Sequence, residues 1–174
     1  MFHATLTTNG AWNSVSRGGG GGWESIESIA IDSRDNILVL GTYTANFALG
    51  LDNLVDWDSN GDKRDIFLAQ LDSNYQWEWA ISAGGSGDDT ARSLQLGENE
   101  SPVAGLHIQN TVQLSNFTLT AAGSDDIAFW NYARDHDSDG LTDGTDNCPR
   151  VANPDQQDTD GDLRDDLNTL GSGT

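Results

Sequence analysis

The first 134 residues of this chain repeat themselves with a period of about 65 residues. Aromatic, glycine and aliphatic residues recur at this spacing: Phe2 with Phe67, Leu6 with Leu71, Asn9 with Asn74, Trp12 with Trp77, Gly19 with Gly84, Gly20 with Gly85, Gly22 with Gly87, Ile29 with Leu94, and Ile31 with Leu96. A one-residue slip aligns Val39 and Gly41 with Val103 and Gly105, and a further deletion aligns Asp65 and Ile66 with Asp126 and Ile127. Such self-similarity is typical of stacked or radial repeats, in which each unit is one supersecondary piece.

The local patterns within each repeat predict β-strands. Short runs rich in Ile, Leu, Val and Trp, at residues 28–32, 36–43, 66–71 and 77–81, are bounded by Asp, Asn, Ser and Gly. The sequences DSRDN and DSNYQ lie between consecutive runs and predict tight turns. No stretch has convincing helical periodicity, so the sequence predicts an all-β antiparallel meander.

Three segments of the repeat, IAIDSRDNILVLGTYT, DIFLAQLDSNYQW and GGSGDDTARSLQL, resemble bacterial β-propeller repeats of the SBBP type. The resemblance covers residues 1–133 and implies antiparallel four-stranded blades. The chain would hold about two and a half of them: two strands of an earlier blade, one whole blade at residues 19–82, and a third that stops after three strands. Because propellers typically close with four to eight blades, we expect an incomplete propeller from a longer protein. An open sandwich of two sheets is the alternative.

After the repeats comes an aspartate-rich stretch with regular spacing. Asp135, Asp137 and Asp139 stand at alternate positions, Gly140 follows, and Asp143 and Asp146 fall at positions nine and twelve. Calcium loops take ligands from positions 1, 3, 5, 9 and 12 and from the backbone carbonyl at position 7, which is Leu141 here. A solvated acidic linker is the alternative, but the ordered spacing with glycine favours a calcium site.

The run DHDSDGLTDGTDNCPRVANPDQQDTDGD resembles a thrombospondin type 3 repeat. The matching residues are Asp135, Asp137, Asp139, Gly140, Asp143, Asp146, Asn147, Cys148, Pro149, Asn153 and Gln156. The resemblance implies a chain with little hydrophobic core that wraps around calcium. It also implies that Asp135, Asp137, Asp139 and Asp146 are direct ligands and that Asp143 is direct or water-linked.

A second aspartate series completes the predicted metal set. It contains Asp158, Asp160, Asp162 and Asp166, with Leu163 where the loop pattern has glycine. The sequence thus predicts a propeller repeat region at residues 1–133, a calcium-binding repeat at 134–170 and a tail at 171–174.

The net charge of −20 restricts the partners of the chain. A surface this acidic repels phosphate, so nucleic acid is excluded as a partner and cations are favoured. No apolar run approaches the length of a membrane span, so we expect no membrane insertion. Cys148 is the single cysteine and cannot form an internal disulfide. Calcium modules with affinities of roughly 0.1 to 1 mM work outside the cytoplasm, which favours an extracellular location.

Other acidic clusters are better explained by structure than by chemistry. The loop at residues 56–65 begins like a calcium loop, but its twelfth position is Phe67, which cannot be a ligand. The pairs Asp88 with Asp89 and Asp125 with Asp126 lie in turns that the repeat explains. No nucleophile, base and orienting acid occur together, so we expect no enzyme.

The sequence therefore predicts a non-enzymatic, calcium-binding structural or adhesive module of a secreted or cell-surface bacterial protein, associated with the outer membrane. Its blades would form an interaction surface for protein or carbohydrate ligands, and the aspartate repeat would be a calcium-stiffened connector. The alternative is a fragment of a carbohydrate-active or lyase-type propeller enzyme whose catalytic residues lie on other blades.

Overall fold

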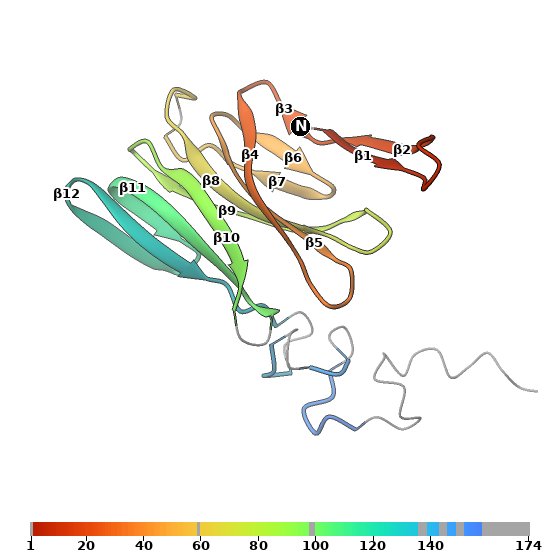
Figure 1. The fold of residues 1–174 in the computed structure, drawn as a ribbon. Coiled ribbons are helices and arrows are strands. Elements are labelled where there is room, and N and C mark those ends of the chain that lie inside the picture. The colour runs from red at the N-terminus through yellow and green to blue at the C-terminus, as the bar shows by residue number, and fades with distance from the viewer. Residues whose placement is uncertain are drawn as a thin grey trace, which may run out of the picture. The chain divides into compact units, whose positions relative to one another are not determined.

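The computed structural model describes residues 2–58, 60–97, 100–135, 139–142, 146–148 and 152–157 (Figure 1). Two compact units are present, one made of residues 1–95 with 104–130 and the other of residues 96–103 with 131–174. Strands account for 58% of the structure, and the described part contains no helix. The predicted all-β class is therefore confirmed.

The strands form three sheets. They are β1 (Phe2–Leu6), β2 (Trp12–Arg17), β3 (Gly19–Gly20), β4 (Glu24–Ile31), β5 (Ile37–Tyr43), β6 (Phe47–Leu49), β7 (Asp52–Leu54), β8 (Asp65–Leu71), β9 (Trp77–Gly85), β10 (Thr90–Leu96), β11 (Pro102–Leu114) and β12 (Phe117–Asn131). The largest sheet has the order β10-β11-β9-β8-β5-β4, with β12 paired to β11. Strands β1 and β2 form a hairpin, and β3, β6 and β7 form a small sheet.

The predicted antiparallel meander is present as β4-β5-β8-β9, with each strand antiparallel to the next. The sheet does not end there, because the end of β9 pairs with the end of β11. Strands β4, β5, β8 and β9 of the first repeat and β10, β11 and β12 of the second thus belong to one sheet rather than to separate four-stranded sheets. The predicted number of blades is not confirmed.

Four turns share one hydrogen-bond pattern and come in two pairs that are 65 residues apart. In each turn, the amide of the first residue donates a hydrogen bond to the carbonyl oxygen of the fifth residue. The bonds run from Thr7 to Ala11 at 2.8 Å, Asp72 to Gln76 at 2.9 Å, Asp32 to Asn36 at 3.1 Å, and Gly97 to Ser101 at 2.8 Å. The fourth residue of each has a positive φ: 82° at Gly10, 63° at Tyr75, 63° at Asp35 and 58° at Glu100. The backbone therefore has the period that the sequence predicts.

The pairing between repeats also recurs with this period. Gly19 pairs with Ala48 and Gly20 with Phe47 in the small sheet. In the large sheet Gly84 pairs with Gln113 and Gly85 with Val112, so all four positions are shifted by 65. A Cβ on Gly85 would lie 1.9 Å from the Thr111 carbonyl oxygen, which explains why glycine is required at this approach.

One detail of the sequence alignment is wrong. The one-residue slip places Gly105 at the position of Gly41, yet a Cβ on Gly105 would meet Ser93 at 2.6 Å and Phe129 at 3.9 Å. Leu40 has the corresponding neighbours in the first repeat, since it pairs with Ser28 and Leu68. Gly105 thus occupies the position of Leu40 without a slip. The slip arose because each repeat has one glycine in this strand, at positions that differ by one residue.

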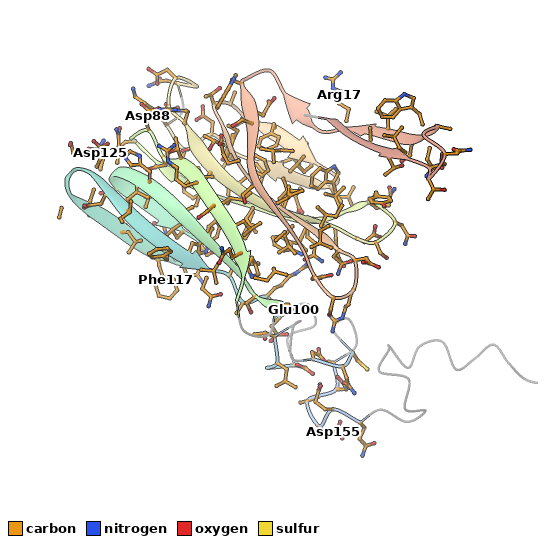
Figure 2. All side chains as sticks on the ribbon, in the orientation of Figure 1. Arg17, Asp88, Glu100, Phe117, Asp125 and Asp155 are labelled. Atoms are coloured by element: carbon orange, nitrogen blue, oxygen red, sulfur yellow. The ribbon has the colours of Figure 1, made fainter. Side chains whose placement is uncertain are left out.

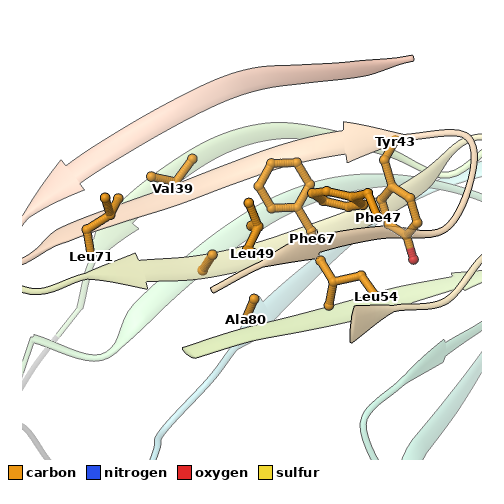
Figure 3. Packing of buried hydrophobic residues seen from close by; sticks show 9 residues of the cluster. Val39, Tyr43, Phe47, Leu49, Leu54, Phe67, Leu71 and Ala80 are labelled. Atoms are coloured by element: carbon orange, nitrogen blue, oxygen red, sulfur yellow. The ribbon is translucent and has the colours of Figure 1, made fainter. Parts of the chain in front are cut away.

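The core of the first repeat lies between the meander and the β6–β7 hairpin (Figure 3). The Tyr43 and Phe47 ring centroids are 4.9 Å apart, and those of Phe47 and Phe67 are 5.3 Å apart in an edge-to-face arrangement. The Tyr43 hydroxyl donates a hydrogen bond of 2.5 Å to the Val55 carbonyl oxygen. This bond satisfies the one polar group of a fully buried ring, as aromatic cores require.

We expect Asp72→Ala to destabilise the first unit by about 1 to 2 kcal/mol. The Asp72 carboxylate accepts hydrogen bonds from the amides of Asn74 at 2.9 Å and Gln76 at 2.8 Å, and alanine leaves both amides without this acceptor. Urea unfolding followed by tryptophan fluorescence measures the change. The exposed neighbour provides the control, Ser73→Ala, and equal losses in the two variants would contradict this role.

Candidate metal centre

The structure describes four of the ten predicted metal ligands. Asp135, Asp139, Leu141 and Asp146 have described positions, whereas Asp137, Asp143, Asp158, Asp160, Asp162 and Asp166 lie outside the described residues. In the part of the chain that is described, no three His, Cys, Asp or Glu side chains come together as a set that could hold a metal ion.

Asp139 joins the two halves of the aspartate-rich segment. Its Oδ1 accepts the amide of Leu141 at 2.9 Å, and its Oδ2 accepts the amide of Asn153 at 3.0 Å. The next residue, Gly140, has a φ of 98°, which L side chains rarely adopt. The glycine at position six of the loop pattern thus permits a backbone turn that other residues would strain.

Asp146 is a buried carboxylate, with 2% of its surface exposed. Its Oδ1 accepts hydrogen bonds from the Cys148 amide at 2.8 Å and from Nε2 of Gln156 at 2.9 Å. Its own amide donates to the Thr142 carbonyl oxygen at 3.0 Å. The carboxylate at position twelve is therefore oriented by two donors, the Cys148 amide and the Gln156 side chain, while the backbone of Asp146 is held by Thr142.

Three amide side chains form a network that sequence reasoning missed. The Asn153 side chain donates to Oδ1 of Asn147 at 2.7 Å. The backbone amide of Asn147 donates to Oε1 of Gln156 at 2.9 Å. Asn147 also donates from Nδ2 to the Gln156 carbonyl oxygen at 3.2 Å. The sequence matched these residues to the repeat pattern, but nothing in the pattern gave them a role. Their side chains both donate and accept, which lets them link aspartate-bearing loops.

Asp135 has one buried carboxylate oxygen without a hydrogen-bond partner among the described residues. Its Oδ2 accepts the Gly140 amide at 3.1 Å, while its Oδ1 is buried and has no hydrogen-bond partner among the described residues. A buried carboxylate oxygen without a partner is costly unless a cation or water completes it. Carboxylate oxygens are also the ligands that calcium prefers. The donor chemistry of Asp135, Asp139 and Asp146 therefore fits calcium.

In the loop at residues 56–65, the described hydrogen bonds favour a turn between two strands over a calcium loop. Asp58 accepts amide hydrogen bonds from Asn60 at 2.9 Å, Gly61 at 2.9 Å and Lys63 at 2.7 Å. Although burial raises the pKa of Asp58, these backbone hydrogen bonds outweigh it and hold the pKa well below its usual range. The carboxylate is thus used to close the turn.

The paired aspartates also have structural partners; Asp88 and Asp125 are labelled in Figure 2. Oδ1 of Asp88 accepts a hydrogen bond from Nε of Arg64 at 3.1 Å. Oδ1 of Asp125 lies 3.5 Å from Nε2 of His107. Asp89 is fully buried and accepts the Gln109 amide at 2.8 Å. Burial raises the pKa of Asp89 to about 6, and the neighbouring charge of Asp88 adds to the effect.

None of the described residues forms a helix long and apolar enough to cross a membrane. No curated protein matched the chain in a sequence comparison. The resemblance of residues 1–133 to SBBP repeats has no support from a family match. The family model of the thrombospondin type 3 repeat does match, over residues 133–156, and these repeats are known to bind calcium. The segment that holds Asp135, Asp139 and Asp146 is thus similar to a thrombospondin type 3 repeat.

Proposed function

We propose that this chain is a calcium-binding, non-enzymatic structural module. The buried Oδ1 of Asp135 carries the proposal, because it has no partner among the described residues and stands at the first position of the calcium pattern. The match of residues 133–156 to thrombospondin type 3 repeats supports the same ion. Bound calcium would supply the positive charge that a cluster of carboxylates requires.

The contacts of the segment support a stiffening role. Asp139 and Asp146 each accept hydrogen bonds from residues more than eight positions away, Asn153 and Gln156 respectively. A cation on these carboxylates would fix the loops that they already connect. The segment would then act as a calcium-stiffened connector, with the β-strands of residues 1–133 as the interaction surface of a longer propeller-type protein.

The location that fits this proposal is extracellular or on the bacterial cell surface, where millimolar calcium can saturate weak sites. In that setting the module would serve adhesion, with protein or carbohydrate ligands as the partners of the β-strand surface. The acidic character of the chain, with a net charge of −20, is compatible with cation binding and unfavourable for nucleic acid.

Isothermal titration calorimetry of the calcium-free chain tests the proposal. We expect a calcium dissociation constant of about 0.1 to 1 mM at physiological salt, and much weaker binding of magnesium, which retains its water ligands. Non-specific attraction by the net charge would not distinguish the two ions. Equal affinities for calcium and magnesium would therefore contradict a built site, and nanomolar calcium affinity would contradict the extracellular role.

A further inference from the structure

The compact unit made of residues 1–95 with 104–130 is called the β-strand unit. Two of its apolar surfaces are exposed. On β12, Ile127 is 79% exposed and Phe129 is 78% exposed; we name this pair the tail face. On β4, Ile26 is 45% exposed and Ile29 is 58% exposed; we name this pair the head face. Strand β4 ends the sheet on one side, and β12 lies with β11 and β10 toward the other (Figure 1).

The residues equivalent to the tail face in the first repeat are fully buried. Ser28, Leu40 and Leu68 are cross-strand neighbours, and Ser93, Gly105 and Phe129 form the same arrangement in the second repeat. Phe129 is therefore equivalent to Leu68. Two residues earlier on each strand, Ile127 is equivalent to Ile66, and both Ile66 and Leu68 have an exposed fraction of 0%.

The second repeat contacts the strands next to Ile66 and Leu68 on this face. Thr42 pairs with Ile66 and shares its face. The Thr42 hydroxyl accepts the Ala91 amide of β10 at 3.1 Å, in a buried hydrogen bond. The amide of Asp89, the residue before β10, donates to the Arg64 carbonyl oxygen, just before β8, at 2.7 Å. Strand β10 thus lies against the face that Ile66 and Leu68 form.

The covering residues of β10 are in turn equivalent to the head face. Ala91 is 1% exposed and Leu94 is 6% exposed, and Ala91 makes the hydrogen bond to Thr42 of the first repeat. At a spacing of 65 residues they correspond to Ile26 and Ile29. The head face and the tail face are therefore the two halves of an interface that the chain already contains once, between its own repeats.

We propose that the tail face of one copy of this chain binds the head face of a second copy, in the manner in which its first repeat binds its second. The contact is heterologous, because a different surface is used on each copy. A complex of two copies retains one unused head face and one unused tail face, so association can continue into a ring or an open chain. The net charge of −20 opposes this contact, so association strengthens as salt rises to screen it.

Light scattering coupled to size-exclusion chromatography, at several protein and salt concentrations, tests the proposal on the whole chain. The mass of the wild-type chain should rise with concentration beyond that of a dimer. Phe129→Asp should block the tail face and Ile29→Asp the head face, each weakening self-association by about tenfold or more. Leu51→Asp is the matched control, since Leu51 is 99% exposed and belongs to neither face.

Mixing the two variants gives the sharpest result. The Phe129→Asp copy retains its head face and the Ile29→Asp copy retains its tail face, so the mixture should form a one-to-one dimer and nothing larger. Each variant should retain the wild-type circular dichroism spectrum, because the replaced side chains are exposed. A wild-type chain that stays monomeric at every concentration and salt would overturn the proposal. So would a mixture that stays monomeric, or an equal effect of Leu51→Asp.

Discussion

Asp146→Ala is expected to weaken calcium binding by about 100-fold or more and to leave the β-strand unit intact. Asp146 is the position-twelve carboxylate, it is 2% exposed, and it orients the Cys148 amide and the Gln156 side chain. Alanine removes the proposed ligand and leaves these donors without their acceptor. Because calcium binding and folding of such a segment are coupled, the loss of affinity is also a loss of local stability.

A neighbouring exposed aspartate gives the control for this experiment. Asp155 lies in the same segment and its carboxylate accepts only a long contact, 3.4 Å from the Gln157 amide, among the hydrogen bonds described. Asp155→Ala removes the same charge but none of the buried contacts. Calorimetry should show near wild-type affinity for Asp155→Ala. Comparable losses in the two variants would mean that net charge, and not a built site, attracts the ion.

Asp65→Asn is expected to stabilise the β-strand unit at pH 8 and to reduce the dependence of its stability on pH. Asp65 is fully buried and accepts the Trp57 amide at 2.8 Å, a bond that asparagine can keep. Burial, together with the charges of Asp56 and Asp89, raises the pKa of Asp65 from its ordinary 3.8 to about 7. Between these two pKa values the folded state holds a proton that the unfolded state has lost, and at pH 8 the folded state must hold a buried charge.

The sign of the effect follows from proton linkage. Between pH 4 and pH 7 the folded chain binds more protons at Asp65 than the unfolded chain does, so stability falls as the pH rises through this range. Over this range Asp65 lowers the free energy of unfolding by on the order of 4 kcal/mol. Asp89, with a pKa raised to about 6, acts in the same direction. Asp58 acts in the opposite direction but only at lower pH, because its pKa is depressed.

Urea unfolding at pH 5 and pH 8 in the presence of a chelator separates these contributions. The wild-type chain should be less stable at pH 8, and Asp65→Asn should remove most of the difference. Asp35→Asn is the control, since Asp35 is exposed and asparagine tolerates its φ of 63°. A variant that gains the same stability at both values of pH would contradict a raised pKa at Asp65.

The sequence predicted the repeating parts of the fold because turns carry strong local signals. Asp32 and Asp72 close their turns with the same hydrogen bonds, to amides two and four residues later. The pairing of β9 with β11 could not be predicted, because a contact between repeats depends on how whole strands are placed. The same limit applies to the position of Gly105, which only cross-strand neighbours define.

Alternate aspartates followed by glycine predict a calcium loop, and the ligand set stays a prediction. The structure shows that Asp135, Asp139 and Asp146 each accept a backbone hydrogen bond within the segment. The amide network of Asn147, Asn153 and Gln156 was not predicted, because its members interact across the segment without regular spacing. Gln156 also has a φ of 53°, an unusual conformation that no sequence pattern signals.

Limited proteolysis during a calcium titration tests the central claim most directly. Trypsin cleavage after Arg134 and Arg150 reports on the aspartate-rich segment, while cleavage within the β-strand unit provides an internal reference. Calcium at millimolar concentration should slow cleavage of the segment at least about tenfold relative to chelator, with a midpoint that matches the calorimetric dissociation constant. Equally fast cleavage with chelator and with millimolar calcium would contradict a calcium-stabilised segment.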